Sequence, residues 1–312
     1  MPERPGFLDI SDEVRQTLDQ SGAVVAFEST IISHGMPYPQ NLETAVKLEQ
    51  TARDAGAVPA TIAILDGRLK VGLSGAELEQ LARQGPDASK ISRRDLPFAV
   101  SRGISGGTTV AATMIIARMA GIKVFATGGI GGVHRGAQDS LDISADLEEL
   151  ARTAVAVVCA GPKAILDIGR TLEYLETRGV AVVGYRTDEL PAFYTRTSGF
   201  AVDYRCDTAA EIAALLHNQQ AMGLDGGMVI ANPVPDEFAL DPVLVESIIQ
   251  QAHKDTAEQQ VTGKNLTPFL LQRIETLSGG DSLTTNIQLI INNARLAAKI
   301  AVALRKQNSN HT

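Results

Sequence analysis

The sequence has few cysteines, no excess of positive charge and no long uninterrupted apolar run. Its two cysteines, Cys159 and Cys206, have no paired spacing that could hold zinc, so a reducing cytoplasm is the simplest setting. The formal net charge of -8 gives no reason, across the whole chain, to expect nucleic acid or an anionic membrane as a partner. The longest apolar region, residues 108–133, contains Arg118, Lys123 and several glycines, so we expect no membrane span.

Short apolar runs alternate with stretches of helical periodicity. One such stretch, "NLETAVKLEQTARDAG" at residues 41–56, repeats apolar side chains at helical spacing and ends at Gly56. Continuous apolar runs are typical of strands that are covered on both faces. The pattern predicts one domain over residues 1–312, with a three-layer α/β/α fold, a central mostly parallel or mixed sheet and a short disordered tail at about 306–312. The apolar runs are "AVVAF" from residue 23, "ATIAIL" from 60, "IKVFAT" from 122, "AVAVVCA" from 154, "VAVVGY" from 180 and "GMVIAN" from 227.

Glu28 directly follows the first apolar run, in "FESTIISHG". In an open α/β sheet the ligand site lies beyond the carboxyl ends of the strands, which is where we expect this carboxyl group. Glu28 is a candidate proton donor, or else a capping partner for the next element. Ser29 and His34 lie in the same stretch, but their spacing certifies no catalytic triad, so a serine hydrolase is only weakly supported.

Lys163 lies in "CAGPKAILDIGRTLEYLE", residues 159–176, where the pattern predicts a strand, a Gly-Pro turn and a helix whose first turn carries the lysine. A helix start opposes a cation, so the lysine either binds a phosphate or serves as an uncharged amine. An attacking amine must first lose its proton, and the helix start supplies only about 0.3–1 kcal/mol toward that loss. The sequence therefore predicts that Lys163 is largely buried near the strand ends.

Residues 125–150, "FATGGIGGVHRGAQDSLDISADLEEL", combine five glycines with a cluster of acids. Their spacing completes neither the dinucleotide pattern nor the Walker pattern. The glycines indicate either a flexible turn or a backbone that passes close to a ligand. Asp139, Asp142 and Asp146 would share one face of a helix and could hold Mg²⁺ or Mn²⁺; alternatively, Asp142 or Ser144 caps the following helix.

Two further segments suit phosphate binding. "SKISRRDLP", residues 89–97, contains Lys90, Arg93 and Arg94, which could instead be ordinary surface charges. "GGTTVAATMIIARMAG", residues 106–121, is a glycine-rich turn entering a helix, where capping by Thr108 or Thr109 is the alternative.

Taken together, these segments and several others resemble the pseudouridine-5'-phosphate glycosidase family, which includes the indigoidine synthase A-like proteins. The resemblance extends from about residue 8 to about residue 305 without large gaps. It implies reversible cleavage of the carbon-carbon glycosidic bond of pseudouridine 5'-phosphate to uracil and ribose 5-phosphate, with one Mn²⁺ per subunit of a homotrimer. The segments that carry it are "FESTIISHGMPYPQN", "SKISRRDLPF", "GGTTVAATMIIA", "KVFATGGIGGVHRGA", "DISADLEELA", "VCAGPKAILDI", "YLETRGV", "LPAFYTRTS", "ANPVP", "TPFLL" and "GGDSLTTNIQLIINNA".

The resemblance also implies roles for individual residues. Lys163 matches the nucleophile that forms an imine with C1 of the ring-opened ribose, Glu28 matches the proton donor and Asp142 matches the manganese ligand. The substrate-binding residues that it implies are Lys90, Thr109, Val110, His134, Ser144, Ala145, Asp146 and Asn286. Two alternatives remain: a class I aldolase-like enzyme acting on another sugar phosphate, and a non-catalytic sugar-phosphate-binding regulator in which Lys163 only clamps phosphate.

Overall fold

The computed structural model describes residues 5–259, 261 and 266–309. Its centre is a mixed sheet of eleven strands. Each of the six predicted runs forms one of these strands, as the alternating pattern indicated. The strands of this sheet are β1 (Leu8–Ile10), β2 (Val24–Phe27), β3 (Val58–Leu65), β4 (Arg68–Val71), β5 (Ser89–Ile91), β6 (Gly106–Thr108), β7 (Val124–Ala126), β9 (Ala156–Cys159), β11 (Ala181–Tyr185), β12 (Tyr204–Cys206) and β13 (Met228–Ala231). Two short strands, β8 (Val133–His134) and β10 (Leu166–Asp167), pair separately.

The sheet is parallel through its centre and antiparallel near one edge. The order β3-β2-β7-β9-β13-β11-β12 is joined by parallel pairs throughout. β4 is antiparallel to β3 because Asp66 and Gly67, with φ of 49° and 73°, form the tight two-residue turn that suits a hairpin. The predicted mostly parallel or mixed sheet is therefore confirmed.

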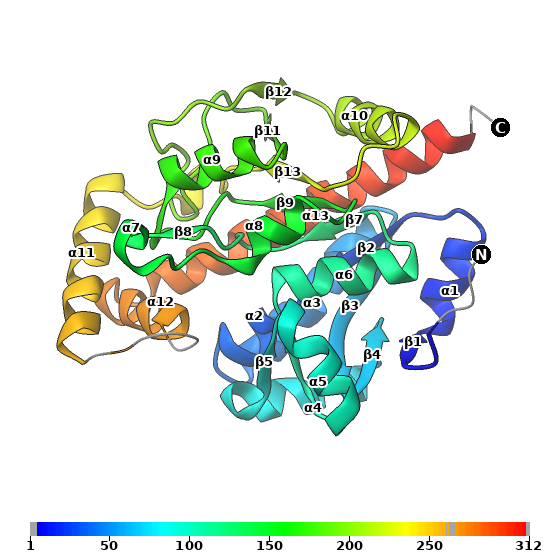
Figure 1. The fold of residues 1–312 in the computed structure, drawn as a ribbon, viewed down its shortest axis with the longest axis horizontal. Helices are drawn as coiled ribbons and strands as arrows, with labels where there is room; N and C mark the ends of the chain where they lie inside the picture. Colours follow the sequence, from blue (N-terminus) through cyan, green and yellow to red (C-terminus); the bar gives the residue numbers. More distant parts are fainter. Residues whose placement is uncertain (1–4, 260, 262–265, 310–312) are drawn as a thin grey trace.

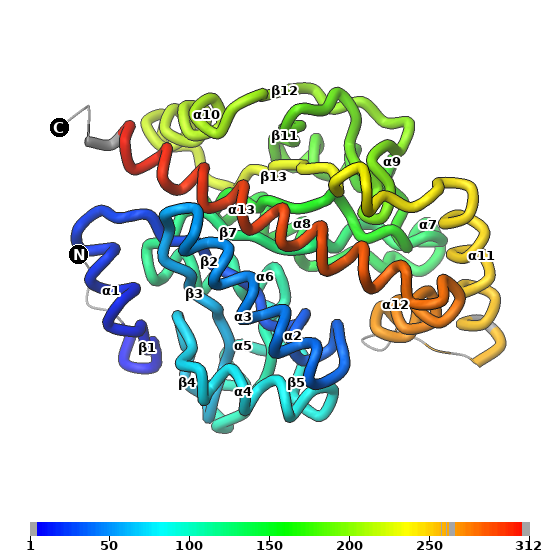
Figure 2. The backbone as a smooth tube through the Cα atoms, turned by 180° about the vertical axis from the view of Figure 1, so that it is seen from behind, coloured from blue at the N-terminus to red at the C-terminus, as the bar shows by residue number. Residues whose placement is uncertain are grey.

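Helices cover both faces of the sheet. Figure 1 shows α6 and α8 in front of the strands, and Figure 2 shows α3 and α13 on the opposite side. The helices are α1 (Asp12–Asp19), α2 (Thr30–His34), α3 (Gln40–Asp54), α4 (Gly75–Gln84), α5 (Leu96–Arg102), α6 (Val110–Ala120), α7 (Ala137–Ser140), α8 (Ala145–Leu150), α9 (Ile168–Thr177), α10 (Ala209–Ala221), α11 (Pro242–Glu258), α12 (Leu266–Leu277) and α13 (Asp281–Ser309). Short 3-10 turns occupy Gly85–Asp87, Arg93–Asp95 and Asp236–Phe238.

Successive side chains of β2 enter the two different cores, as the pleat of a strand requires. Val25 and Phe27 pack into the cluster that includes α13, whereas Val24 and Ala26 pack into the cluster that includes α6. Both faces of this central strand are thus buried in hydrophobic cores. The polar residue that follows the strand, Glu28, lies at the carboxyl edge of the sheet.

α13 is the central helix of one layer. By length and composition alone it could cross a membrane, but 61% of its most apolar 18-residue window is buried inside the structure, as expected for a core helix. It packs against β2, β7, β9, α3 and α10. The helix continues to Ser309, so the disordered tail predicted from about residue 306 is helical as far as that residue; residues 310–312 lie outside the described residues.

The helix predicted to begin at Lys163 begins five residues later, at Ile168. Asp167 is its N-cap and accepts a hydrogen bond from the backbone N–H of Arg170 at 3.0 Å. The intervening residues Leu166 and Asp167 pair with β8 instead of turning into a helix. The predicted position of Lys163 on a helix is therefore wrong, because an inter-strand pairing that sequence spacing does not reveal precedes the helix.

Candidate active site

Four of the predicted site residues line one small cavity at the carboxyl edge of the sheet. Glu28, Lys90, Lys163 and Asn286 meet there, around a volume of about 60 Å³. They come from places far apart in the sequence: the end of β2, β5, the loop after β9, and α13. The cavity also receives Thr30, His34, Gly128, Phe193, Pro268 and Leu271.

Lys163 is held by a continuation of the pairing between β7 and β9. Beyond the strand ends, the N–H of Ala160 donates to Gly128 O at 2.9 Å and the N–H of Ile130 donates to Gly161 O at 3.2 Å. The N–H of Lys163 then donates to Ile130 O at 3.0 Å. This fixes the backbone of the lysine in an extended loop, while its side chain is half-buried, less than the sequence predicted.

Glu28 leaves β2 directly into the cavity and is only 6% exposed. One carboxylate oxygen accepts a hydrogen bond from the Thr30 hydroxyl, and the other accepts one from the Thr127 hydroxyl. Thr127 follows β7 just as Glu28 follows the neighbouring β2. The buried carboxyl group therefore has a fixed orientation within the cavity that also receives Lys163.

The three cations of the "SKISRRDLP" segment have different environments. Lys90 lines the cavity, on β5. Arg93 instead pairs with the buried carboxylate of Glu149, and the side chain of Arg94 is 78% exposed. Of these three, Lys90 is the cation that could contact a ligand in the cavity.

His134 and Asp142 lie beside the cavity without lining it. Burial, followed by the positive charges of Lys163 and Lys90, lowers the pKa of His134, while the charge of Asp142 acts in the opposite sense. The backbone N–H of His134 also donates to Asp142 O at 3.0 Å. The site therefore combines two lysines, a neutral imidazole and a carboxylate in one region.

The acidic residues that follow the glycine segment mainly form hydrogen bonds that hold the backbone in place. Asp146 is 6% exposed, and its two carboxylate oxygens accept backbone N–H groups of Ala111 and Gly131, each at 2.9 Å. Ser144 is the N-cap of α8 and accepts from the N–H of Asp146 at 3.2 Å, which confirms the capping alternative for this residue. Ala145 is exposed at the start of the same helix.

The start of α6 is arranged through its backbone. Thr109 is the N-cap and accepts from the N–H of Ala112 at 3.4 Å, as the capping alternative predicted. The side chain of Val110 is 1% exposed and packs in the core, so any contact of Val110 with a ligand must use the main chain. Thr109 and Val110 directly follow β6, the strand that pairs with Lys90 through Gly107.

Asn286 contributes an unpaired polar atom. Its Oδ1 is buried and has no hydrogen-bond partner in the described structure. The same atom lies 3.2 Å from the position that a Cβ on Gly128 would occupy, so glycine at 128 keeps this end of the cavity open. A buried acceptor without a partner is costly, so Asn286 is a candidate ligand-binding residue.

Two other nucleophiles near the site are excluded. The Ser29 hydroxyl is fully buried and donates to Ile62 O at 2.7 Å. His34 contacts Ser33 rather than Ser29, so the Ser–His pair that a serine hydrolase requires is not formed. Burial raises the pKa of the Cys159 thiol to about 12, which keeps it protonated at neutral pH.

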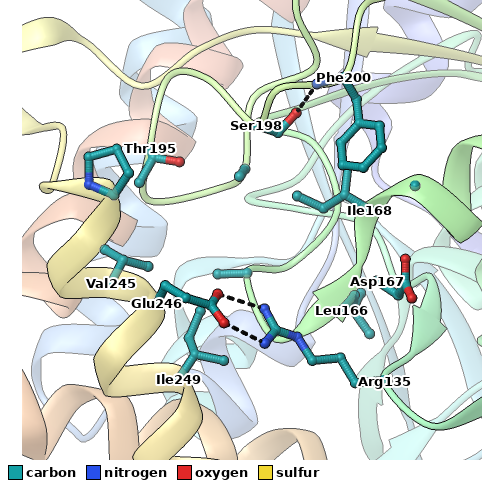
Figure 3. Close-up of a pocket in the computed structure, with 14 residues that line it drawn as sticks. Arg135, Leu166, Asp167, Ile168, Thr195, Ser198, Phe200, Val245, Glu246 and Ile249 are labelled. Atoms are coloured by element: carbon teal, nitrogen blue, oxygen red, sulfur yellow. Dashed lines mark hydrogen bonds and ion pairs between the residues drawn. The ribbon is translucent and has the colours of Figure 1, made fainter.

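A separate cavity of about 400 Å³ is lined by residues that include Ile168, Phe200 and Glu246 (Figure 3). Arg135 and Glu246 form a two-pronged ion pair on its wall, at 2.8 and 2.9 Å. Ser198 there accepts from the N–H of Phe200 at 3.3 Å and donates to Leu190 O at 2.6 Å. Neither Lys163 nor Glu28 lines this cavity and its polar groups are internally paired, so the smaller cavity is the candidate active site.

The sequence analysis assigned no role to Thr127, Phe193 or the α12 residues of the site, although the quoted motifs contain them. Phe193 has φ of 65°, rare for a bulky side chain, and its ring packs against Gly129 at the cavity wall. α12 covers the cavity with Thr267, Pro268 and Leu271. Thr127 could have been found from its position, because it directly follows a predicted strand as Glu28 does.

A metal held entirely by protein ligands does not fit this site. Among the described residues, no group of three or more His, Cys, Asp or Glu side chains is placed to hold an ion. A largely hydrated Mn²⁺ or Mg²⁺ does fit, because such ions commonly take one or two carboxylates and otherwise bind water. The half-buried Asp142 could supply that carboxylate.

Two pseudouridine-5'-phosphate glycosidases are similar to nearly the whole chain. A pseudouridine-5'-phosphate glycosidase from Hahella chejuensis is 60% identical over 95% of this chain and 98% of its own length. One from Escherichia coli is 59% identical over 95% of each chain.

Solved structures share the fold. The prealnumycin C-glycosynthase AlnA, determined with ribulose 5-phosphate, superposes with a TM-score of 0.90, 38% identity and coverage of 98% of this chain and 99% of its own. An indigoidine synthase A-like protein from Thermotoga maritima gives a TM-score of 0.87 at 34% identity, over 96% of this chain and 97% of its own. The model of the family described as indigoidine synthase A-like proteins matches residues 13–303. The family that the motifs indicated is therefore confirmed, and the chain belongs to the indigoidine synthase A-like family, together with the pseudouridine-5'-phosphate glycosidases.

Proposed function

We propose that the protein cleaves the carbon-carbon glycosidic bond of pseudouridine 5'-phosphate reversibly, with water, to give uracil and ribose 5-phosphate. The observation that carries this proposal is the meeting of an amine, Lys163, and a buried carboxyl group, Glu28, in one cavity with a second cation, Lys90. The names of relatives at about 60% identity support the same activity. They favour it over a class I aldolase-like enzyme and over a non-catalytic regulator.

The chemistry of a C-glycoside explains why a lysine is needed. The usual pair of carboxylates in glycosidases protonates a leaving oxygen, which a carbon-linked base does not offer. An amine bonded to C1 of the ribose can instead push electrons toward the base, because it becomes a stable protonated imine.

Lys163 and Glu28 divide the reaction between them. Nζ of Lys163, as the neutral amine, bonds to C1 as the bond from C1 to the ribose ring oxygen breaks. The proton that the bonded nitrogen then loses goes to the ring oxygen, which becomes a hydroxyl. The nitrogen lone pair then forms the C1–N double bond, and the electron pair of the C1–C5 bond remains on uracil C5, which takes a proton from Glu28. Water hydrolyses the imine and its released proton restores Glu28, so ribose 5-phosphate leaves and the free amine of Lys163 returns.

The remaining predicted residues bind the substrate in this proposal. Lys90 attracts the phosphate, and the backbone at the start of α6, with Thr109 and Val110, offers N–H groups to the same anion. The start of α8, with Ser144, Ala145 and Asp146, lies against the glycine segment and completes the phosphate end together with His134. The unpaired Oδ1 of Asn286 accepts a hydrogen bond from the substrate.

Asp142 would hold Mn²⁺, one ion per subunit. The ion, when bound with its water ligands, supplies positive charge close to the phosphate end of the site. The neutral His134 imidazole beside Asp142 adds no positive charge of its own to repel it. We further propose a homotrimer in the cytoplasm, for which family membership is the support; light scattering of the purified protein would test the trimer.

Synthesis from the two products tests the function directly. Protein, Mn²⁺, uracil and ribose 5-phosphate are mixed, and NMR should reveal the carbon-linked nucleotide. Borohydride added to protein and ribose 5-phosphate should leave a covalent adduct on Lys163, which Lys163→Ala abolishes. Unchanged reactants together with an adduct would favour the aldolase-like alternative, and the absence of any adduct would refute the imine mechanism.

A further inference from the structure

The carboxyl group of Glu28 is held at both of its oxygens by threonine hydroxyls. The hydroxyl of Thr30 donates to Oε2 and that of Thr127 donates to Oε1. The two threonines come from different places: Thr30 begins α2, two residues beyond Glu28, whereas Thr127 follows the neighbouring strand β7. The carboxyl group is thus clamped from its own loop and from the adjacent strand.

Thr127 is itself fixed through its backbone. It is fully buried, and its N–H donates to Val158 O at 3.0 Å. Its carbonyl oxygen accepts from Nδ2 of Asn293 on α13, at 2.8 Å. Oδ1 of Asn293 accepts in turn from Nδ2 of Asn232 at 2.9 Å, and the N–H of Asn232 donates to Cys159 O at 2.8 Å.

These contacts join four neighbouring strand ends of the sheet. Glu28, Thr127 and Asn232 directly follow β2, β7 and β13, and Cys159 ends β9. Asn293, which is fully buried, reaches the carboxyl edge of the sheet from the helix that covers its face. Asn232 of "ANPVP" and Asn293 of "IINNA" have no role in the proposed reaction. The chain of hydrogen bonds explains why these two motif residues are asparagines.

Fixing this carboxyl group matters because proton transfer needs close heavy atoms. A general acid must lie about 2.6–3.2 Å from the atom it protonates. A free glutamate side chain loses up to about 2 kcal/mol of rotamer entropy when it is ordered. Two hydroxyl donors supply that order before substrate arrives, while each carboxylate oxygen keeps a second lone pair for the transferred proton.

We propose that Thr30 and Thr127 are positioning residues for the proton-transfer step, and that the Asn293–Asn232 amide pair holds Thr127 in place. This inference rests on the proposed role of Glu28. Neither threonine forms or breaks a bond with the substrate; each acts by keeping the carboxyl group aimed at uracil C5.

Replacing threonine by valine removes the hydroxyl but keeps the side-chain volume nearly constant. These variants therefore test the hydrogen bonds to Glu28 separately from packing. Thr127→Val and Thr30→Val should each lower kcat for cleavage roughly 10- to 100-fold, part of the 10²- to 10⁴-fold that a general acid supplies. KM should change by less than about threefold, because substrate binding uses other residues. Borohydride trapping of the ribose 5-phosphate imine on Lys163 should stay at the wild-type level, and Thr127→Ser, which keeps the hydroxyl, should recover most of the lost kcat.

Thr256→Val is the matched control. Thr256 is buried on α11, and its hydroxyl donates to Ala252 O at 2.8 Å, outside the cavity. This variant should lose thermal stability to a similar extent and keep kcat. Because Thr30 is only half-buried, Thr30→Val keeps the test available if Thr127→Val does not fold.

Glu28→Gln distinguishes a failure of the threonine positioning role from a failure of the proposed role of Glu28 as proton donor. If Glu28→Gln forms the imine but loses cleavage while both valine variants keep kcat within about threefold, the positioning role is refuted and the proposed function stands. Equal loss in the valine and serine variants of Thr127 would also refute it, because the hydroxyl would then be irrelevant. If Glu28→Gln still cleaves, the role of Glu28 and the positioning role fail together.

Discussion

Gly161 passes so close to Pro191 that a Cβ atom on Gly161 would lie 2.1 Å from the Pro191 carbonyl oxygen. Gly161 also has φ of 86°, a conformation that other residues rarely adopt. It lies two residues before Lys163, in the paired segment that fixes the lysine backbone. The glycine of "AGPK" is thus a steric requirement of the loop that presents the amine.

Gly161→Ala should therefore affect both stability and catalysis. Strain and overpacking together should lower the free energy of unfolding by about 2–4 kcal/mol, measured by urea denaturation. The displaced loop should also reduce the rate of imine trapping. Gly179→Ala is the control, since Gly179 has φ of 70° but open space around it, and should cost about 1–2 kcal/mol without slowing trapping. Equal effects of the two substitutions would contradict the steric explanation.

Lys90→Ala should weaken binding of ribose 5-phosphate by roughly 10- to 100-fold, because it removes one charged contact to phosphate. Isothermal calorimetry with ribose 5-phosphate, compared with ribose, measures this loss. Arg94→Ala removes an equally charged but largely exposed side chain from the same segment and should leave the affinity unchanged. Similar losses in both variants would mean that general attraction, not a specific contact, binds the phosphate.

Asp142→Ala should raise the Mn²⁺ concentration needed for half-maximal activity by roughly tenfold or more, since it removes the proposed protein ligand. Electron paramagnetic resonance of free Mn²⁺ during titration gives the affinity without depending on turnover. Asp139→Ala, an exposed carboxylate on α7, is the control and should bind Mn²⁺ as the wild type does. An unchanged titration in Asp142→Ala would remove this residue from the metal site.

The free energy of unfolding should fall as the pH drops below about 6.5, the ordinary histidine value. Burial, followed for His253 by the charge of Arg135 and for His34 by the charge of Lys90, lowers the pKa of both imidazoles. Below pH 6.5 the histidines of the unfolded chain become protonated while those of the folded protein stay neutral. Each histidine therefore lowers the free energy of unfolding by up to about 1.4 kcal/mol for each pH unit. His253→Asn should make the profile shallower between pH 6.5 and 5, measured by urea denaturation at each pH. An unchanged slope would contradict the lowered pKa.

Six of the eleven strands of the main sheet, and helices such as α3, could be predicted from the sequence because each depends on a local pattern. The run at Val24–Phe27 is apolar throughout, and that at Val58–Leu65 contains only one polar residue, Thr61. α3 ends at Asp54, just before the Gly56 that its spacing predicted as the stop. The start of α9 could not be found this way. Leu166 and Asp167 pair with His134 and Val133, about thirty residues earlier, and that contact displaces the helix from Lys163 to Ile168.

The candidate site was predictable only in part, for a similar reason. Glu28 follows a recognisable strand, and Lys163 follows another through a Gly-Pro turn, so both could be found from position. The clamp on Glu28 depends on Thr127 and, beyond it, on Asn293, which is 166 residues further along the chain. Such a contact follows from the packing of α13 across the sheet, and no local spacing encodes it.

The position of α13 after all the strands in the sequence has a consequence for how the enzyme is made. Glu28 and Lys163 leave the ribosome long before Asp281–Ser309 is synthesised, yet this helix supplies Asn286 and the Asn293 contact and covers β2, β7 and β9. Chains are made from the amino terminus, so that face of the sheet stays open until α13 has been made. A nascent chain stalled before residue 281 should therefore be inactive and prone to aggregate, because the helix that completes the catalyst is made only after all the strands.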